Sequence, residues 1–535
     1  MQTIASHSEP NTSPVAALAH VFERALAAGT AVALGLAAGL LAAKLMRRGR
    51  VHWSWGLAGL GAALLATRAH VVGSSAAVLA AFSAAALTRR WHANDLEAGK
   101  DLAEVALSLR SPADTLRRAL RGALLRRRLH TQASWFRGDE LIIGRDAAAR
   151  LSAIPLGGSA GGTHTLVLGA TGSGKTMTQA WIATRAIERG MGAIVIDPKG
   201  DRTLRDAVRL AARSRASAFI EWSPSGRSVY NPYSRGTDTE IADKALAGER
   251  FTEPHYLRQA QRYLGHAVRV LRQAGLEVSL RSLVEVLDPV ALERIARTLA
   301  EHHVCATHSY LDSLTPRQTR DLAGVRDRLA ILAESDLGAW LDPGTPGVPS
   351  FDLLEAVRAR AVVYFTLDAD SRPLLSQMLG AAIVQDLLTT VAALQGRPLP
   401  TLALIDEFSS ISVEHVVRLF GRARSAGVSL VLGTQELADL RLPGRERTLD
   451  QIMGNLATVV AHRQVLAQSC ALIAGLAGTR GAWRTSRHSD GRTTRTRTSE
   501  DVLAPERLRR LAPGSAAVTV LAGGADARVV RVFSI

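Results

Sequence analysis

The sequence predicts an α/β protein with a mostly parallel sheet, an inserted all-α region and N-terminal transmembrane helices. Three observations support this fold class. From about residue 137 onward, short apolar runs typical of buried strands alternate with helical stretches. Within that part, residues 169–176 read GATGSGKT between a strand-like and a helix-like segment. Before it, residues 25–43 are almost entirely Ala, Leu, Gly and Val, which is long enough to span a bilayer.

Length and composition narrow the possible partners. The chain has 535 residues and a formal net charge of +17, which favours a polyanionic partner, either nucleic acid or an anionic membrane face. Aromatic residues make up only 4% of the chain, so we expect few platforms for base stacking. Cys305 and Cys470 form neither a metal pattern nor a disulfide framework, which suits a reducing cytoplasm.

Residues 1–92 are predicted to be a membrane anchor of two to three transmembrane helices. Apolar runs occupy residues 25–43, 53–67 and 71–87, and the middle run is short for a span. Arginines follow the first and the third run. Because positive charge marks the cytoplasmic side, we favour three spans, with an external N-terminus and both arginine clusters in the cytoplasm. A cleaved signal peptide would begin with a basic segment, which is missing before the first apolar run, so we disfavour it. A buried Ala-rich hairpin remains an alternative.

Residues 93–136 are predicted to be a basic juxtamembrane connector. Between residues 115 and 129, leucines recur at helical spacing beside six arginines, which indicates a basic amphipathic helix. Such a helix can present a solvated cationic face, or it can contact nucleic acid or anionic lipid headgroups. We favour lipid because the membrane segment is adjacent in sequence.

The segment 169–176 matches the phosphate-binding pattern G-x-x-x-x-G-K-[ST]. A strand is expected at 164–168 and a helix at 177–189. In this setting backbone N–H groups point at phosphate oxygens, and Lys175 reaches the β- and γ-phosphates of ATP. The Thr176 hydroxyl is expected to bind Mg²⁺. The expected nucleotide contacts are Gly169, Ala170, Thr171, Gly172, Ser173, Gly174, Lys175, Thr176 and Met177.

Three further segments complete the predicted site. The apolar strand at 401–405 ends in Asp406, expected to hold Mg²⁺, and in Glu407, expected to act as general base. Gln435, at the end of the strand at 428–432, is expected to sense the γ-phosphate or position water, although it could simply be a polar strand end. Asp197 begins a turn at the same sheet edge and is a possible nucleotide contact.

Ten segments of the body are expected to form strands, and the last two of them to form a terminal hairpin that joins the core sheet. The turn of that hairpin contains Gly523 and Gly524. The strands are expected at residues 141–143, 164–168, 193–196, 218–222, 361–367, 402–405, 428–432, 457–461, 516–521 and 528–533.

The order of these motifs resembles one family. GATGSGKT is followed by IDPKGD, by NPY at 231–233, by LIDEF, and then by GRARSAG and LGTQ. In this order the chain resembles conjugative coupling proteins of the TraG/TraD type, which are ATPases of the FtsK/HerA-like RecA superfamily. The resemblance covers roughly residues 137–535 and implies a RecA-like P-loop NTPase core. The short loops between the apolar runs differ from the sizeable extracytoplasmic segment of that family.

The resemblance implies a hexameric, membrane-anchored motor that uses ATP and Mg²⁺. By motif match, the residues that bind or hydrolyse the nucleotide are Lys175, Thr176, Asp406, Glu407 and Gln435. Arg424 is a candidate arginine finger that acts on a neighbouring subunit, with Arg422 as the second choice; an exposed helix arginine is the simpler interpretation.

The long interval between the P-loop and Asp406 predicts an inserted all-α domain, which the same family carries. Helices are expected at 260–274, 280–287, 290–302 and 316–333. The predicted domains are the anchor (1–92), the connector (93–136), the first part of the ATPase core (137–238), the inserted domain (239–345) and the second part of the core (346–535).

A late segment, residues 480–497, contains six arginines among Thr, Ser and Gly. Its low apolar content predicts a flexible loop, either solvated or in contact with a phosphate backbone without sequence specificity.

The sequence as a whole predicts a multi-pass protein of the cytoplasmic membrane with its ATPase domain in the cytoplasm. Its expected activity is ATP-driven DNA translocation that couples DNA, with relaxase or relaxosome proteins, to a type IV secretion channel. The alternatives are an FtsK/HerA-like translocase in chromosome partitioning or processing, and an ATP-gated membrane scaffold.

Overall fold

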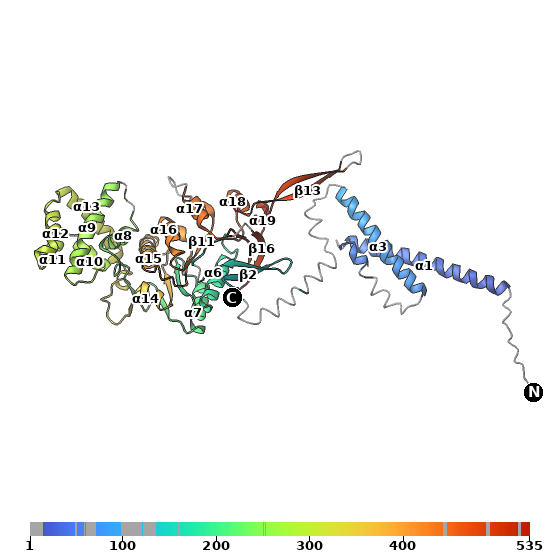
Figure 1. Ribbon diagram of the computed structural model, residues 1–535, viewed down its shortest axis with the longest axis horizontal. Coiled ribbons are helices and arrows are strands. Elements are labelled where there is room, and N and C mark those ends of the chain that lie inside the picture. Colours follow the sequence, from blue (N-terminus) through green and yellow to red (C-terminus); the bar gives the residue numbers. More distant parts are fainter. Residues whose placement is uncertain are drawn as a thin grey trace, which may run out of the picture. The chain divides into compact units, whose positions relative to one another are not determined.

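The computed structural model divides into two units, residues 1–130 and residues 131–535 (Figure 1). Each unit is described by itself. The structure describes residues 14–48, 51–57, 59, 71–97 and 120 of the first unit. In the second unit it describes residues 135–535, apart from 159–160, 250, 252, 412, 442–446, 488–492 and 523–525. The predicted connector, 93–136, lies mostly outside these residues.

Two long helices of the first unit, α1 (Pro14–Arg48) and α3 (Val71–Glu97), pack closely in parallel. A Cβ atom added at Gly35 would lie 2.8 Å from the carbonyl oxygen of Ala76. One added at Gly39 would lie only 1.8 Å from Ser83 Oγ. Going from Gly35 to Gly39 along α1, the contacted residue on α3 moves from Ala76 to Ser83, so the two helices run in the same direction. Glycines allow this close approach because they present no side chain.

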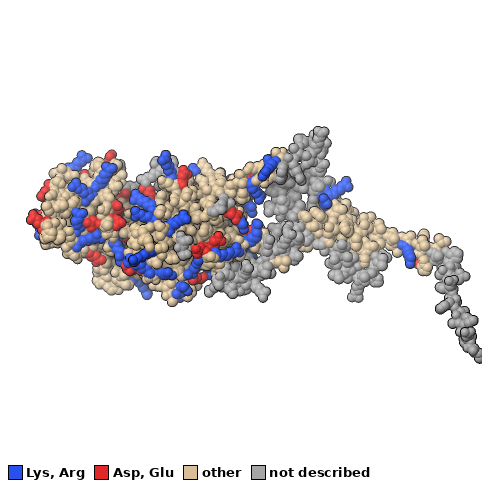
Figure 2. Space-filling view, in the orientation of Figure 1, with Lys and Arg blue, Asp and Glu red and all other residues tan. Residues whose placement is uncertain are grey.

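Among the described residues, two helical segments are long and apolar enough to cross a membrane, Leu18–Arg48 and Pro373–Ala393. The second is a helix of the body whose apolar window is 67% buried, as expected of a core helix. The first exposes large apolar side chains, among them Leu18 and Leu34, and Figure 2 shows few charges on its surface. The predicted span 25–43 therefore lies in a membrane-competent helix. Helix α3 contains the third run but fails the same test, and most of the second run lies outside the described residues.

A twelve-stranded sheet forms the body. Its order is β1-β2-β16-β15-β12-β4-β11-β10-β5-β9-β6, with β3 paired to β2. The seven strands from β12 to β6 are parallel, and the strands on the other side of β12 pair antiparallel. All ten predicted strands are present, and the predicted terminal hairpin, β15–β16, joins this sheet. Its turn lies outside the described residues.

The strands have the following bounds: β1 Phe136–Arg137, β2 Glu140–Asp146, β3 Leu151–Pro155, β4 His164–Leu168, β5 Gly192–Asp197, β6 Phe219–Trp222, β9 Val362–Thr366, β10 Thr401–Ile405, β11 Val428–Thr434, β12 Thr458–Ala461, β15 Ser515–Val520 and β16 Asp526–Val532. Two short strands, β7 (Val229–Tyr230) and β8 (Ser350–Phe351), pair outside the sheet.

Helices cover both faces of the parallel strands. Leu166 and Leu168 of β4 belong to one hydrophobic core and Val167 to the other, because side chains alternate along a strand. Helices α6 and α7 contribute to the core that contains Val167, and α15 and α16 to the opposite core. The helices of the body are α6 Lys175–Glu188, α7 Arg202–Ser214, α14 Leu353–Arg358, α15 Pro373–Ala393, α16 Val413–Ala423, α17 Arg447–Asn455, α18 Ala467–Ala477 and α19 Pro505–Arg509.

A continuous run of helices fills the predicted inserted domain. They are α8 Asp238–Leu246, α9 Pro254–Gln273, α10 Leu280–Val286, α11 Pro289–Ala296, α12 Glu301–Asp312 and α13 Pro316–Ala333. The single helix predicted at 290–302 is wrong, because α11 ends at Ala296 and α12 begins at Glu301. Ala300 has extended backbone angles, and the Thr298 hydroxyl donates to the Ile295 carbonyl oxygen (2.7 Å), which closes the end of α11.

A buried ion pair joins this helical domain to the core. Lys244 of α8 is fully buried, and its Nζ donates to Asp386 Oδ1 of α15 (2.6 Å) and to the carbonyl oxygens of Pro232 (3.0 Å) and Arg235 (2.6 Å). The Tyr230 hydroxyl donates to the other oxygen of Asp386 (2.6 Å). All three ammonium protons therefore have acceptors, as a buried charge requires.

The arginine-rich segment near the C-terminus is a β-ribbon, so the predicted flexible loop at 480–497 is wrong. Strands β13 (Thr479–Arg487) and β14 (Thr493–Asp501) pair antiparallel over their whole length. The first part of β14 reads TTRTRT, and its β-branched threonines favour an extended backbone despite the low apolar content. Figure 1 shows the ribbon projecting from the body near α18 and α19.

Candidate nucleotide site

The loop after β4 forms a tight cradle at the C-terminal edge of the parallel strands. Gly172 and Gly174 have φ values of +72° and +110°, which only glycine adopts without strain. A Cβ atom added at Gly169 would lie 2.4 Å from Ser173 Oγ, so the loop has no space for a side chain there. Helix α6 begins directly after the loop, at Lys175, and directs its first N–H groups toward the cradle.

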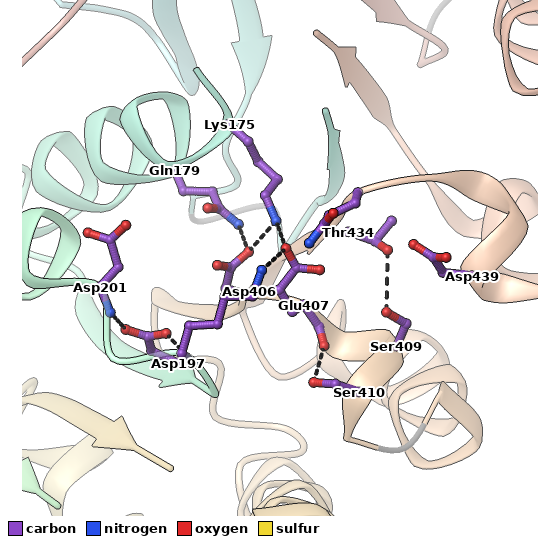
Figure 3. Close-up of polar contacts among 12 residues, drawn as sticks. Lys175, Gln179, Asp197, Asp201, Asp406, Glu407, Ser409, Ser410, Thr434 and Asp439 are labelled. Atoms are coloured by element: carbon purple, nitrogen blue, oxygen red, sulfur yellow. Dashed lines mark hydrogen bonds and ion pairs between the residues drawn. The ribbon is translucent and has the colours of Figure 1, made fainter. Parts of the chain in front are cut away.

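Strand β10 brings the acidic pair to the lysine of this loop (Figure 3). Lys175 Nζ lies 3.1 Å from Asp406 Oδ1 and also pairs with Glu407 Oε1. The three residues are buried, with exposed fractions of 8%, 4% and 6%, so solvent screens their interaction little. Only β11 separates β4 from β10 in the sheet, and parallel strands place their C-terminal ends at one edge. The predicted P-loop lysine and acidic pair therefore form one cluster.

Glu407 has a left-handed backbone with φ +40°, which is uncommon outside glycine. The Ser410 hydroxyl donates to its carbonyl oxygen (2.8 Å), and a short 3-10 helix, Phe408–Ser410, follows directly. Unusual backbone angles of this kind concentrate at functional sites, where the surrounding structure stabilises them. The turn directs the Glu407 carboxylate back to the P-loop lysine.

Two residues that the sequence did not indicate support Asp406. Gln179 of α6 is fully buried, and its Nε2 donates to Asp406 Oδ1 (2.8 Å). Gly433 of β11 provides the space for this bond, because a Cβ atom there would lie 2.1 Å from Gln179 Nε2 and 2.4 Å from Asp406 Oδ1. The glycine in the LGTQ segment is therefore a steric requirement of the site.

Asp197, a predicted nucleotide contact, organises its own turn. Its carboxylate accepts hydrogen bonds from the backbone N–H groups of Lys199 (3.0 Å), Gly200 (2.9 Å) and Asp201 (2.6 Å), and from the Tyr364 hydroxyl (2.6 Å). Burial raises the pKa of Asp197, the Tyr364 hydrogen bond lowers it, and the nearby Asp406 raises it. The side chain lies at the predicted sheet edge, where the described contacts give it a positioning role.

His462, just after β12, supports the P-loop from behind. Its Nδ1 lies 3.0 Å from the Ser515 carbonyl oxygen and its Nε2 lies 2.8 Å from Thr178 Oγ1. Because a carbonyl only accepts, we assign the proton to Nδ1, and Nε2 accepts from the threonine hydroxyl. Burial lowers the pKa of His462 to about 4, which keeps the ring neutral. Gly514 also contacts the loop, where its N–H donates to the Ser173 carbonyl oxygen (2.9 Å).

Gln435 and Arg424 lie at opposite edges of the sheet. Gln435 directly follows β11, at the edge of the P-loop, and is partly buried. Arg424 follows α16 and is exposed, and its carbonyl oxygen accepts from the N–H of Gly162 (2.9 Å), just before β4 begins. It is therefore far from the phosphate cradle of its own chain, and its predicted role requires a neighbouring chain. Arg422, the second choice, is exposed on α16.

The donor set fits Mg²⁺. Asp406 and Thr176 supply a carboxylate and a hydroxyl oxygen at the same cradle, and Mg²⁺ prefers hard oxygen ligands shared with substrate phosphates. Among the described residues, no cluster of three or more His, Cys, Asp or Glu forms an all-protein metal cage. The site therefore suits a metal ion that arrives with nucleotide.

Two family models match the body. The model for the TraM recognition site of TraD and TraG matches residues 400–513, and the model for the central domain of helicase HerA matches residues 154–218. No curated protein sequence matches the chain. The matches confirm the resemblance to TraG/TraD-type and HerA-like proteins that the motif order indicated.

Solved structures share the fold. The TrwBdeltaN70 form of a bacterial conjugative coupling protein is 16% identical, with a TM-score of 0.54 over 76% of this chain and 91% of that one. TrwB with a non-hydrolysable GTP analogue is 18% identical, with a TM-score of 0.53 over 75% and 94%. VirB4 of Thermoanaerobacter pseudethanolicus is 14% identical, with a TM-score of 0.51 over 75% and 98%. These similarities confirm the predicted α/β fold of the body, with its parallel sheet and P-loop.

Proposed function

We propose that the chain is a membrane-anchored, ATP-driven DNA translocase that delivers DNA, or a relaxase–DNA substrate, to a type IV secretion channel. The meeting of Lys175, Asp406 and Glu407 at the P-loop, in a fold shared with a conjugative coupling protein, carries the proposal. TrwB structures contain ADP with Mg²⁺ and an ATP analogue, which supports ATP and Mg²⁺ as ligands. The TraM-recognition match supports relaxosome and secretion-channel partners.

The chain's own groups provide the chemistry of hydrolysis. Lys175 and the N–H groups of residues 169–174 hold the phosphates. Glu407 accepts a proton from the attacking water while the water oxygen bonds to the γ-phosphorus and the bridging oxygen leaves with ADP. Thr176 and Asp406 would hold Mg²⁺, which neutralises phosphate charge when bound. Gln435 would position the water.

We place this site between subunits of a homo-hexamer. The exposed Arg424 lies at the sheet edge opposite the P-loop of its own chain, which supports its action on a neighbouring chain. An arginine supplied in trans would stabilise the charge that develops on the transferring phosphoryl group.

DNA is expected to bind through its backbone. The net charge of +17 and the arginine-rich ribbon β13–β14 support contacts that do not depend on sequence. In Figure 2 basic side chains are spread over the visible face of the body among acidic ones, so the described residues of that face present no continuous basic track for a phosphate backbone.

The decisive experiment measures ATP hydrolysis by the full-length protein in detergent, with and without DNA, over a salt series. We expect DNA to stimulate hydrolysis at about 50 mM salt and the stimulation to fall steeply by about 200 mM, because binding releases counterions. ATP binding without DNA-stimulated hydrolysis at any salt would instead support an ATP-gated scaffold. DNA stimulation without any effect of gene deletion on conjugative transfer would favour chromosome partitioning.

We further propose a three-pass anchor with the ATPase body in the cytoplasm. The parallel packing of α1 and α3 supports it, because two parallel spans require the chain to return across the membrane between them. Single cysteines placed at residues 12, 50 and 69, in a chain whose Cys305 and Cys470 have been replaced by alanine, test this by labelling with a membrane-impermeant maleimide. We expect residues 12 and 69 to react from outside and residue 50 only after lysis; protection of residue 69 in intact cells would contradict three passes.

A further inference from the structure

We infer that Lys199 senses the γ-phosphate of ATP and thereby releases Glu407 for catalysis, an inference that rests on the proposed ATPase function. Lys199 Nζ donates to Glu407 Oε1 at 3.1 Å. The same oxygen also pairs with Lys175, so two ammonium groups share one carboxylate atom. Lys199 belongs to the DPKGD segment, which the sequence indicates as a turn and a possible active-site loop, without a role for the lysine.

The turn that carries Lys199 is built to present it. Asp197 accepts hydrogen bonds from three consecutive N–H groups of the turn, and Gly200 has φ +72°. The backbone of the turn is therefore fixed at the sheet edge. The Lys199 side chain is 42% exposed, whereas that of Lys175 is 9% exposed. A partly exposed lysine on a fixed turn can exchange partners without any backbone movement.

The γ-phosphate lies within reach of Lys199. Two nitrogens that hydrogen-bond to one oxygen lie at most about 6 Å apart, since each bond is about 3 Å long. Lys175 is placed to contact the β- and γ-phosphates, so the Lys199 ammonium, which shares Glu407 Oε1 with it, lies beside the same space.

The exchange follows from the number of acceptor sites. A carboxylate oxygen has two lone pairs, and two ammonium groups occupy both on Glu407 Oε1, so only Oε2 is left to take a proton from water until the lysines move away. When ATP binds, Lys175 turns to the phosphates, and the γ-phosphate offers Lys199 a more highly charged acceptor than the carboxylate. ADP offers no γ-phosphate, so Lys199 stays on Glu407. Lys199 keeps its proton throughout and contributes only its charge and its hydrogen bonds.

The test compares Lys199→Met with two matched variants of the full-length protein. Lys199→Arg keeps the charge, and Arg202→Met removes an exposed charge three residues further on. Dissociation constants are measured for ADP and for a non-hydrolysable ATP analogue, together with kcat. We expect Lys199→Met to weaken binding of the analogue about 10- to 100-fold and of ADP less than about twofold, as the loss of one charge-assisted contact implies. Its kcat should fall at least about tenfold, because the γ-phosphate loses the positive charge of Lys199 in the transition state even though Glu407 is already free.

Lys199→Arg should restore much of the preference for the analogue, and Arg202→Met should match the wild type. Equal weakening of ADP and analogue, or no change in either, would overturn the inference. Wild-type protein that binds both nucleotides without hydrolysing ATP would count against the proposed function alone, because the binding comparison still decides the role of Lys199.

Discussion

Lys175→Ala is expected to lower kcat for ATP hydrolysis by about 100- to 1,000-fold and to abolish DNA transfer. Its ammonium is the buried cation that pairs with both Asp406 and Glu407. It is placed to stabilise the negative charge that develops on the phosphates during hydrolysis. Glu407→Gln should reduce kcat at least as much while retaining ATP, because the amide keeps the shape and cannot accept a proton. Radiolabelled phosphate release and nucleotide retention on a filter measure the two effects separately.

The matched control for this prediction is Glu301→Gln, which removes an exposed carboxylate in the first turn of α12, in the helical domain. It should hydrolyse ATP at the wild-type rate. Membrane insertion should be unchanged in all three variants. Undiminished hydrolysis in Lys175→Ala or Glu407→Gln would exclude this cluster as the catalytic site.

Lys244→Met should lower the free energy of unfolding by about 3–5 kcal/mol, which is the largest effect on stability that we expect from a single substitution. The substitution leaves the Asp386 carboxylate buried without its cation, and two carbonyl oxygens lose their donor. Because a chain of several domains need not unfold in two states, we would follow it by limited proteolysis and hydrogen exchange of α8 and α15. Increased cleavage or exchange at this junction is the expected result.

The comparison variant is Arg281→Met, which breaks a salt bridge with Asp342 from a side chain that is 71% exposed. It should cost no more than about 1 kcal/mol, as exposed pairs do. The double variant Lys244→Met/Asp386→Leu should recover part of the lost stability, because it removes the uncompensated charge. Equal effects of Lys244→Met and Arg281→Met would show that the buried pair does not hold the junction.

Local patterns were enough to predict the strands and the meeting of the P-loop lysine with the acidic pair. The P-loop and the acidic pair are short contiguous segments, and parallel strands place their ends at one edge, so Lys175 and Glu407 could be expected to meet. The arginine-rich ribbon was not predicted because its composition suggested disorder, whereas the two segments pair as strands over their whole length. The division between α11 and α12 escaped it because the apolar pattern continues across Ala300.

The supporting residues could not be predicted because their partners are remote in sequence. Lys199 meets Glu407 across 208 positions, Gln179 meets Asp406 across 227, and Thr178 meets His462 across 284. No local spacing rule relates such pairs, and only the sheet order brings them together. The one local signal was a glycine inside a strand, at Gly433, because such a glycine often marks a close approach of neighbouring groups, here Gln179 and Asp406.

The strand pairing at the antiparallel side of the sheet has a consequence for biogenesis. Strand β16, near the end of the chain, inserts between β15 and β2, the first long strand of the body, and Gly514 contacts the P-loop turn. During synthesis, GATGSGKT leaves the ribosome long before the segments that support it. The edge of β2 that pairs with β16 therefore stays unpaired until the last strand is synthesised. The N-terminal helices are available for insertion well before that point. This order would keep the candidate nucleotide site incomplete until β16 and Gly514 have been synthesised.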